Sequence, residues 1–170
     1  MTMSAIPSIG LEHAPLPVRR PLSVVPAGFH AVPAQRGFIH LFGPVYLHDS
    51  EPVVGARVAA QHLNNQDIAH GGFLAALADS AYGIVMRRDM PGVVPRTAHL
   101  SVDYLSAVRE GDWIEGRVNL VKHGRRIINA TCCLTVNGRM VLQTMGVFAT
   151  MSLGDAEAPA GKIRPSETQG

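Results

Sequence analysis

One segment, residues 73–88, most limits what this chain can fold into. Its pattern predicts a helix with apolar side chains around most of its circumference: Phe73, Leu74, Leu77, Ala78, Ala81, Ile84 and Val85. A helix that is apolar on nearly every side is buried, so the rest of the chain must surround it. Several alanines and a glycine within the segment are small enough to let neighbouring strands approach closely. Pro91 and Gly92 are expected to end the helix.

Strands that could surround the helix are predicted mainly after it. Asn137-Gly138, between the last two runs, is the strongest kind of short hairpin signal. We therefore expect the C-terminal half to form an antiparallel meander. The four strand-like runs are residues 96–105, 113–123, 125–136 and 139–150.

Two further elements are expected before the helix. Residues 53–62 alternate in part and predict a strand, and residues 37–46 predict a strand or a short helix leading into one. Together the elements indicate the α+β class, with a curved antiparallel β-sheet wrapped around one long buried helix.

The two ends of the chain differ in composition from its middle. Residues 1–35 are rich in proline and predict an extended or disordered arm, and residues 152–170 predict a flexible tail. Residues 36–151 remain as the folded unit. A chain of 170 residues suits a single domain with such extensions.

Composition and charge argue against several functional classes. A net charge of +2 gives no electrostatic case for nucleic acid binding. No apolar run approaches the roughly 18 residues of a membrane span, and no secretory signal is visible. Cys132 and Cys133 are adjacent in a predicted strand, so they face opposite sides and indicate reduced thiols in a cytoplasmic protein. No zinc-type spacing exists, so no metal is expected.

The start of the helix carries the residues that point to chemistry. A polar turn from Asn64 leads to His70, Gly71 and Gly72, and Asp79 follows about two turns into the helix. Glycine leaves backbone N–H groups approachable, and the helix dipole favours negative charge there. No Lys or Arg lies three or four residues from Asp79. An oxyanion-binding amide combined with a lone buried carboxylate is a layout for acyl transfer.

Each of these residues also has a purely structural interpretation. Asp79 could bond a distant strand instead of activating water or attacking an acyl carbon. His70 could be a surface residue or contact the acyl group, and Asn64 could be a turn residue or orient a water or a carbonyl. Gly71 could be an ordinary turn glycine. Thr97 could be a β-branched strand residue, or its hydroxyl could hold the attacking water.

Basic residues occur at two further places, and one of these leaves two interpretations open. Arg125 and Arg126 lie at a predicted hairpin, where they could form a solvated turn or clamp phosphate groups with their forked donors. Arg87 and Arg88 lie at the C-terminal end of the helix, where they are expected to complement its dipole.

Two stretches of the chain resemble the hotdog-fold acyl-CoA thioesterases, specifically the branch similar to the phenylacetate-degradation thioesterases. Residues 64–79 match that family's pattern of an Asn, a His-Gly-Gly sequence and an Asp in the following helix. Residues 97–112 look like its central strand and the Gly-Asp turn after it. The resemblance spans residues 37–150. It implies a hotdog fold, hydrolysis of an acyl-CoA thioester to a free acid and CoA, and no cofactor or metal.

The resemblance also implies roles for particular residues. Asp79 would be the catalytic carboxylate, and the Gly71 amide would polarise the thioester carbonyl. Asn64 and His70 would line the same site, and Thr97 would position water.

Partners follow from the same resemblance. Arg125 and Arg126 would hold the CoA phosphates. The family builds its sites between subunits, with the carboxylate from one and the Asn/Gly loop from the other. A homodimer, often paired into a homotetramer, is therefore implied.

The chain departs from the family pattern, and other functions remain to be weighed. Asp67 stands where the family often has a glycine, and the proline-rich arm lies outside the family core. A hotdog dehydratase or hydratase would pair a His with an acidic residue, but a His before the helix with Asp79 inside it suits a thioesterase better. A non-catalytic acyl-CoA binder or sensor could share the fold, and the presence of Asp79 disfavours it.

Overall fold

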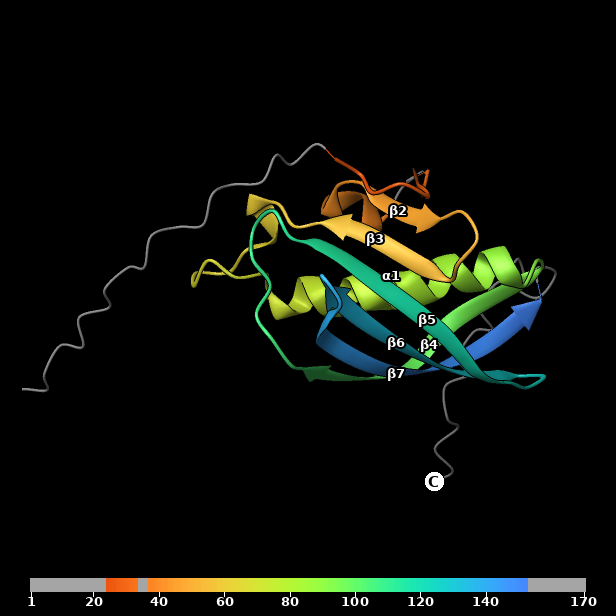
Figure 1. The fold of residues 1–170 in the computed structure, drawn as a ribbon. Helices are drawn as coiled ribbons and strands as arrows, with labels where there is room; N and C mark the ends of the chain where they lie inside the picture. Colours follow the sequence, from red (N-terminus) through yellow and green to blue (C-terminus); the bar gives the residue numbers. More distant parts are fainter. Residues whose placement is uncertain (1–23, 34–36, 153–170) are drawn as a thin grey trace, which may run out of the picture.

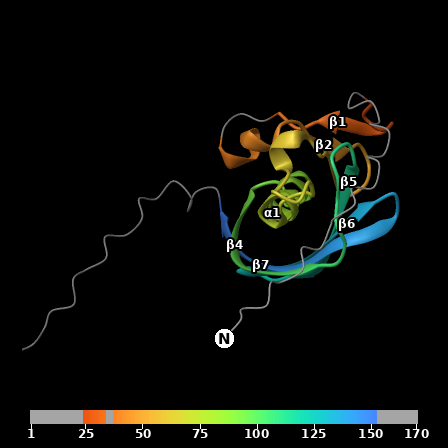
Figure 2. The ribbon, with the colours of Figure 1, turned by 90° about the vertical axis from the view of Figure 1, so that its left-hand side faces the viewer.

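The structure is a computed structural model, and it describes residues 24–33 and 37–152. One long helix, α1 (Gly71–Asp89), lies against a curved antiparallel sheet of seven strands (Figure 1). Viewed along the helix, the sheet curves around α1 (Figure 2). The sheet is open, with β1 at one edge and β4 at the other. The α+β class, and the arrangement of a curved sheet around one long helix, are confirmed.

The strands follow the order β1-β2-β3-β5-β6-β7-β4 across the sheet. Two short 3-10 helices, η1 and η2, lie before α1. The elements other than α1 are β1 (Phe29–Ala31), η1 (Phe38–Phe42), β2 (Val45–His48), β3 (Val53–Arg57), η2 (Ala60–His62), β4 (Val93–Tyr104), β5 (Trp113–His123), β6 (Ile127–Val136) and β7 (Arg139–Ser152).

The predicted meander is right for β5, β6 and β7 but wrong for β4. Strand β4 pairs with β7 at the edge of the sheet and not with β5, its successor in the chain. The segment between β4 and β5 is therefore a crossover and not a hairpin turn. Its buried Val108 accepts a hydrogen bond from the Ala69 N–H (2.8 Å), and the Gly111 N–H donates to the Val58 carbonyl (2.9 Å). Hydrophobic patterning locates strands, but it does not determine which strands become neighbours.

The segments before α1 agree with the predictions in part. Residues 37–46 form η1 and the start of β2, as a short helix leading into a strand. The strand predicted over residues 53–62 is wrong after Arg57, because the last three residues form η2. The Ala59 N–H donates to Nδ1 of His62 (3.0 Å), and the His62 ring stacks on the Phe73 ring with centroids 4.0 Å apart. These contacts turn the chain toward the start of α1.

The sheet extends into the segment that the sequence predicts to be an arm. Strand β1 pairs with β2, so part of residues 24–33 belongs to the folded unit. Residues 1–23 of the predicted arm and residues 153–170 of the predicted tail lie outside the described residues.

The hairpin between β6 and β7 forms where it was predicted. Asn137 has a φ of 49° and Gly138 a φ of 77°, as a type I′ turn requires. Cys132 is buried and Cys133 half-buried, and both are free thiols on opposite faces of β6.

A buried polar network links α1 to the sheet through Tyr82. Its hydroxyl lies 2.8 Å from the hydroxyl of Thr144 on β7, which donates to the Cys132 carbonyl (3.2 Å). Burial raises the pKa of Tyr82 above its ordinary value and raises the pKa of the Cys132 thiol to about 12. Both groups are therefore neutral members of the core. Among the described residues, no helix is long and apolar enough to cross a membrane.

An aromatic cluster covers the face of the sheet that points away from α1. The Trp113 ring lies 5.3 Å from the Phe29 ring and 5.4 Å from the Tyr46 ring, and the Arg57 guanidinium stacks 5.0 Å from its centroid. A Cβ on Gly55 would come within 2.2 Å of the Trp113 ring. Gly55 is therefore required for the close packing of the indole on β3.

Candidate active site

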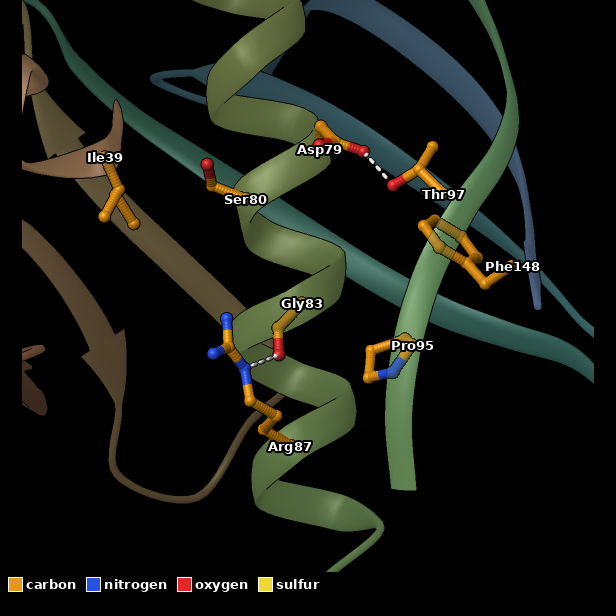
Figure 3. Close-up of a pocket in the computed structure, with 8 residues that line it drawn as sticks. All are labelled: Ile39, Asp79, Ser80, Gly83, Arg87, Pro95, Thr97 and Phe148. Atoms are coloured by element: carbon orange, nitrogen blue, oxygen red, sulfur yellow. Dashed lines mark hydrogen bonds between the residues drawn. The ribbon is translucent and has the colours of Figure 1, made fainter. Parts of the chain in front are cut away.

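The predicted catalytic carboxylate and the predicted water-positioning hydroxyl lie together. Oγ1 of Thr97 on β4 donates to Oδ1 of Asp79 on α1 at 2.8 Å (Figure 3). Asp79 is half-buried, and not buried as its apolar helix suggested. The register of β4 against β7 shifts between Thr97 and His99, which indicates a β-bulge. Bulges often re-aim side chains beside active sites, and this one immediately follows Thr97.

The Asp79–Thr97 pair opens into a pocket of about 220 Å³ between η1 and β4 (Figure 3). Apolar side chains from η1, β4 and β7 contribute to its walls, and α1 together with Thr97 of β4 supplies the remaining residues. Sequence reasoning did not identify Ile39 or Arg87 as part of it. The residues that line the pocket are Ile39, Asp79, Ser80, Gly83, Arg87, Pro95, Thr97 and Phe148. Nowhere in the described part of the chain do three or more His, Cys, Asp or Glu side chains form a group that could hold a metal ion.

The start of α1 is built by His70 and Gly71. His70 is the N-cap, and its Nδ1 accepts a hydrogen bond from the Gly72 N–H (2.9 Å). The hydroxyl of Tyr104, which the sequence did not single out, donates to the Gly71 carbonyl (3.1 Å). A Cβ on Gly71 would lie 3.0 Å from the Tyr104 ring, so glycine permits this approach. In the described part of the chain, nothing accepts a hydrogen bond from the Gly71 N–H.

Asn64 organises the loop that leads into the helix. Its Oδ1 accepts hydrogen bonds from the N–H groups of Gln66 (2.8 Å) and Ile68 (3.4 Å), which is the turn role weighed from the sequence. Asp67 in the same loop has a φ of 55°. This left-handed conformation explains why glycine suits the position, and Asp is among the residues that tolerate it.

The structure does not bring the two predicted halves of the site together within one chain. Gly71 and Asp79 are eight residues apart on α1, so the helical rise separates them by about 12 Å. An oxyanion donor must lie about 3 Å from the reacting oxygen, and a general base within similar reach of the attacking water. A single chain therefore groups Asp79 with Thr97 and leaves Asn64, His70 and Gly71 at the other end.

Arg125 and Arg126 lie outside the pocket. Both are exposed at the turn between β5 and β6. Their carbonyls accept hydrogen bonds from Thr150 on β7. Thr150 is paired with Pro95 on the neighbouring strand β4, and Pro95 belongs to the pocket wall. The two arginines are thus about two strand spacings, roughly 10 Å, from the pocket wall.

Comparison with known proteins identifies the family. The model of the thioesterase superfamily matches residues 66–142. A Pseudomonas aeruginosa protein named "Putative esterase PA0474" is 32% identical over 128 residues, which cover 73% of this chain and 96% of that protein. The chain belongs to the thioesterase superfamily. The resemblance found in the sequence is confirmed, and membership makes the protein a thioester hydrolase.

Solved structures of the superfamily share the fold. Zebrafish thioesterase superfamily member 2 aligns with a TM-score of 0.63 at 25% identity, covering 68% of this chain and 88% of that one. A Streptococcus pneumoniae hypothetical thioesterase solved with coenzyme A gives 0.62 at 25% identity, covering 68% and 91%. A variant of the phenylacetic acid degradation protein PaaI from Thermus thermophilus gives 0.58 at 29% identity, covering 65% and 96%. The hotdog fold is therefore confirmed.

Proposed function

We propose that this thioesterase superfamily member hydrolyses acyl-CoA thioesters to a free carboxylic acid and CoA. The observation that carries the proposal is the Asp79–Thr97 hydrogen bond, at 2.8 Å, in a pocket whose walls combine polar and apolar side chains. The pneumococcal relative was solved with coenzyme A, which supports CoA as the thiol half of the substrate. CoA enters as part of the substrate, and the proposed reaction uses no further cofactor.

The geometry supports general-base catalysis. The Thr97 hydroxyl donates its hydrogen bond to Asp79, so its oxygen can accept a hydrogen bond from a water molecule. The Asp79 carboxylate takes the proton of that water as its oxygen attacks the thioester carbonyl carbon. Collapse of the tetrahedral intermediate breaks the C–S bond, and CoA leaves as a thiolate that regains the proton. Direct attack by Asp79 to give a mixed anhydride and CoA thiolate is the alternative route, and attack of solvent water on the Asp79 carbonyl carbon of that anhydride would place oxygen-18 in Asp79 in a single turnover.

The oxyanion donor is proposed to come from a second copy of the chain. Within one chain the Gly71 amide is about 12 Å from Asp79, yet it has no acceptor among the described residues. Strand β4 is a sheet edge of twelve residues, which is available to pair with another strand. We therefore expect a homodimer, alone or paired into a tetramer. Asp79 and Thr97 would face Asn64, His70 and Gly71 of the partner subunit.

Two further assignments complete the proposal. Arg125 and Arg126 are proposed to clamp the CoA phosphates, because their exposed guanidinium groups lie at the end of the sheet that holds Pro95 of the pocket. A cytoplasmic location is proposed because both cysteines of the chain are free thiols.

The test of the function is release of free thiol from a panel of aromatic and aliphatic acyl-CoAs. Wild-type protein should turn over at least one member, and Asp79→Asn should lower kcat by about 10²- to 10⁴-fold while the melting temperature stays close to that of wild type. Glu115→Gln, on the outer face of β5, removes a carboxylate without touching the pocket and should keep wild-type activity. Retained activity in Asp79→Asn would refute the mechanism. Saturable acyl-CoA binding without any turnover would favour a sensor instead.

The shared site is tested by removing the Gly71 N–H. Proline suits this first helical position, and His70 has the extended ψ of 134° that a residue before proline needs. Tyr104→Ala makes room for the ring, so Gly71→Pro is made in that background and compared with Tyr104→Ala alone. Loss of the oxyanion donor should lower kcat about 10²- to 10³-fold.

Mixing two inactive proteins then tests whether the site is shared. If Asp79→Asn is refolded together with the Gly71→Pro, Tyr104→Ala protein, mixed dimers contain one intact site. With random pairing half of the dimers are mixed, so about a quarter of all sites are intact and the mixture should show about a quarter of the wild-type activity. A mixture that stays inactive, although mass spectrometry detects mixed dimers, would place both groups in one subunit and contradict the shared site.

A further inference from the structure

We propose that Arg87 recognises a carboxylate at the far end of the acyl chain, which makes the preferred substrates CoA monothioesters of dicarboxylic acids. This inference rests on the proposed function, because it takes Asp79 as the point where the thioester carbonyl lies. It adds the substrate class, which neither the family nor its relatives specify for this chain.

The Arg87 side chain is exposed at the edge of the pocket, and its guanidinium folds back along α1 instead of extending beyond the helix end. Its Nε donates to the Gly83 carbonyl at 2.9 Å, which lays the side chain along α1 (Figure 3). A Cβ on Gly83 would lie 3.3 Å from Nη2 of Arg87, so the glycine makes room for this conformation. The remaining N–H groups of Arg87 have no acceptor within the part of the chain that the structure describes. These N–H groups can donate two parallel hydrogen bonds, which is the forked geometry that suits a carboxylate.

The neighbouring Arg88 shows that Arg87 is not needed to complete the helix end. Nη1 of Arg88 donates to the carbonyls of Glu51 (2.8 Å) and His48 (3.3 Å), which fastens the last turn of α1 to the β2–β3 turn. Arg88 also pairs with Asp89, the last residue of the helix. The two adjacent arginines thus have different surroundings, and only Arg87 lines the pocket.

The space between the two charged groups suits a short aliphatic chain. Asp79 and Gly83, whose carbonyl binds Nε of Arg87, are four residues apart on α1, which is a helical rise of about 6 Å between the backbone positions that hold the two groups. Because bonds of about 1.5 Å zigzag, an extended chain advances about 1.25 Å per bond, so two carboxyl carbons with about four methylene groups between them lie about that far apart. Ile39, Pro95 and Phe148 add apolar surface to the same pocket. A carboxylate at the far end would be drawn toward Arg87 and repelled by Asp79, so the charges also orient the chain.

The CoA phosphates are a less suitable partner for Arg87. The segment from Asp79 to Arg87 is about 12 Å long, and the guanidinium folds back toward Asp79. An extended pantetheine arm is longer than this segment, so it would carry the phosphates past the pocket. The carboxylate and the phosphate are the two anions that could occupy the fork, and free CoA as an inhibitor distinguishes them.

The experiment compares matched substrate pairs: adipyl-CoA with hexanoyl-CoA, and suberyl-CoA with octanoyl-CoA. In each pair, wild-type protein should have the higher kcat/KM for the substrate that ends in a carboxylate. The ratio should be larger for adipyl-CoA over hexanoyl-CoA than for suberyl-CoA over octanoyl-CoA. Arg87→Gln should lower kcat/KM for adipyl-CoA roughly tenfold and leave hexanoyl-CoA nearly unchanged. Arg96→Gln is the matched control, because Arg96 lies between Pro95 and Thr97 on β4 and faces away from the pocket. Inhibition by free CoA should be the same in all three proteins.

Several results would overturn the inference without touching the proposed function. Wild-type preference for the methyl-terminated substrates would do so, as would an equal fall for both substrates in Arg87→Gln. Weaker inhibition by CoA in Arg87→Gln would assign the fork to phosphate. Gly83→Ala gives a second view, because it crowds Arg87 while alanine favours the helix, and it should reduce the preference for adipyl-CoA without lowering the melting temperature. Absence of turnover for every substrate would refute the proposed function instead.

Discussion

Two of the hydroxyl hydrogen bonds that join α1 to the sheet differ in surroundings rather than in length. Thr97 bonds Asp79 at 2.8 Å, and Tyr82, only three residues along the helix, lies 2.8 Å from the Thr144 hydroxyl. Tyr82 is fully buried and is surrounded by further acceptors, the carbonyls of Thr144 (3.1 Å) and Ala130 (3.4 Å). Asp79 is half-buried and opens into the pocket.

The Tyr82–Thr144 hydrogen bond stabilises the core, whereas the Thr97–Asp79 hydrogen bond leaves the carboxylate accessible from the pocket. In the core, an unmade hydrogen bond cannot be replaced by water, so Tyr82 and Thr144 must satisfy each other. At the pocket, water or a substrate can replace what Thr97 supplies. Equal geometry therefore predicts unequal consequences of mutation: activity should depend on Thr97, and the free energy of unfolding on Tyr82.

Removing the pocket hydroxyl should have the largest effect on this comparison. Thr97→Val keeps the shape of the strand residue but leaves the attacking water without its second partner, so kcat should fall roughly ten- to a hundredfold. The free energy of unfolding, measured with urea, should change by less than about 0.5 kcal/mol. Thr97→Ser keeps the hydroxyl and should retain most of the activity. A large loss of stability in Thr97→Val, with kcat intact, would make this bond structural like that of Tyr82.

Removing the core hydroxyl should give the opposite pattern. Tyr82→Phe deletes one donor and leaves buried oxygens less well satisfied, so the free energy of unfolding should fall by about 1–2 kcal/mol. The kcat of the folded protein should remain within about twofold of wild type, because Tyr82 does not line the pocket. Urea denaturation followed by circular dichroism measures the first quantity, and thiol release measures the second. A variant with normal stability and a much reduced kcat would overturn the contrast.

Alkaline pH should lower the free energy of unfolding through the buried groups of the same core, and this effect should be smaller than those of the substitutions above. The pKa of Cys132 is raised from 9.0 to about 12, and the pKa of Tyr82 is also raised, in both cases mainly by burial. The unfolded chain thus releases protons that the folded chain retains. The stability from these groups is complete below pH 9 and is lost as the pH rises above it, by at most about 1.4 kcal/mol per pH unit for each group.

Two variants measure that dependence. Cys132→Ala should lose less stability than wild type between pH 8.5 and about 10, and Tyr82→Phe less above pH 10. The free energy of unfolding is measured by urea denaturation at each pH, and its slope against pH is compared between proteins. Slopes are used because each substitution also lowers stability at neutral pH. Slopes identical to wild type in both variants would show that neither group is protected by the core.

The sequence was informative where the determinants are local. The apolar circumference of residues 73–88 predicted α1, and the positive φ values favoured by Asn137 and Gly138 predicted their hairpin. The pattern of residues 64–79 also predicted Asp79 as the carboxylate of the site, and the strand after the helix predicted Thr97 as its partner. Their side chains meet because β4 crosses α1 in the folded chain.

The sequence was less informative where distant segments meet. The position of β4 beside β7 depends on a crossover, which no pattern within either strand encodes. Tyr104 packs on Gly71, and Ile39 reaches the pocket from η1, only because the sheet curves around the helix. Arg87 looked like a dipole-complementing residue because one Arg at a helix end resembles another. Gly83, one turn earlier, was the signal that could have distinguished it from Arg88.

The tight packing of Trp113 against Gly55 has a practical consequence for spectroscopy. Trp113 is the only tryptophan of the chain, so all of its indole fluorescence arises from one place. That place is on the outer face of the sheet, beside Phe29 of β1, Tyr46 of β2 and Arg57 of β3. The emission spectrum should therefore report detachment of these first strands while remaining silent toward a ligand that enters beside α1. The protein carries a built-in optical reporter for local unfolding that needs no labelling.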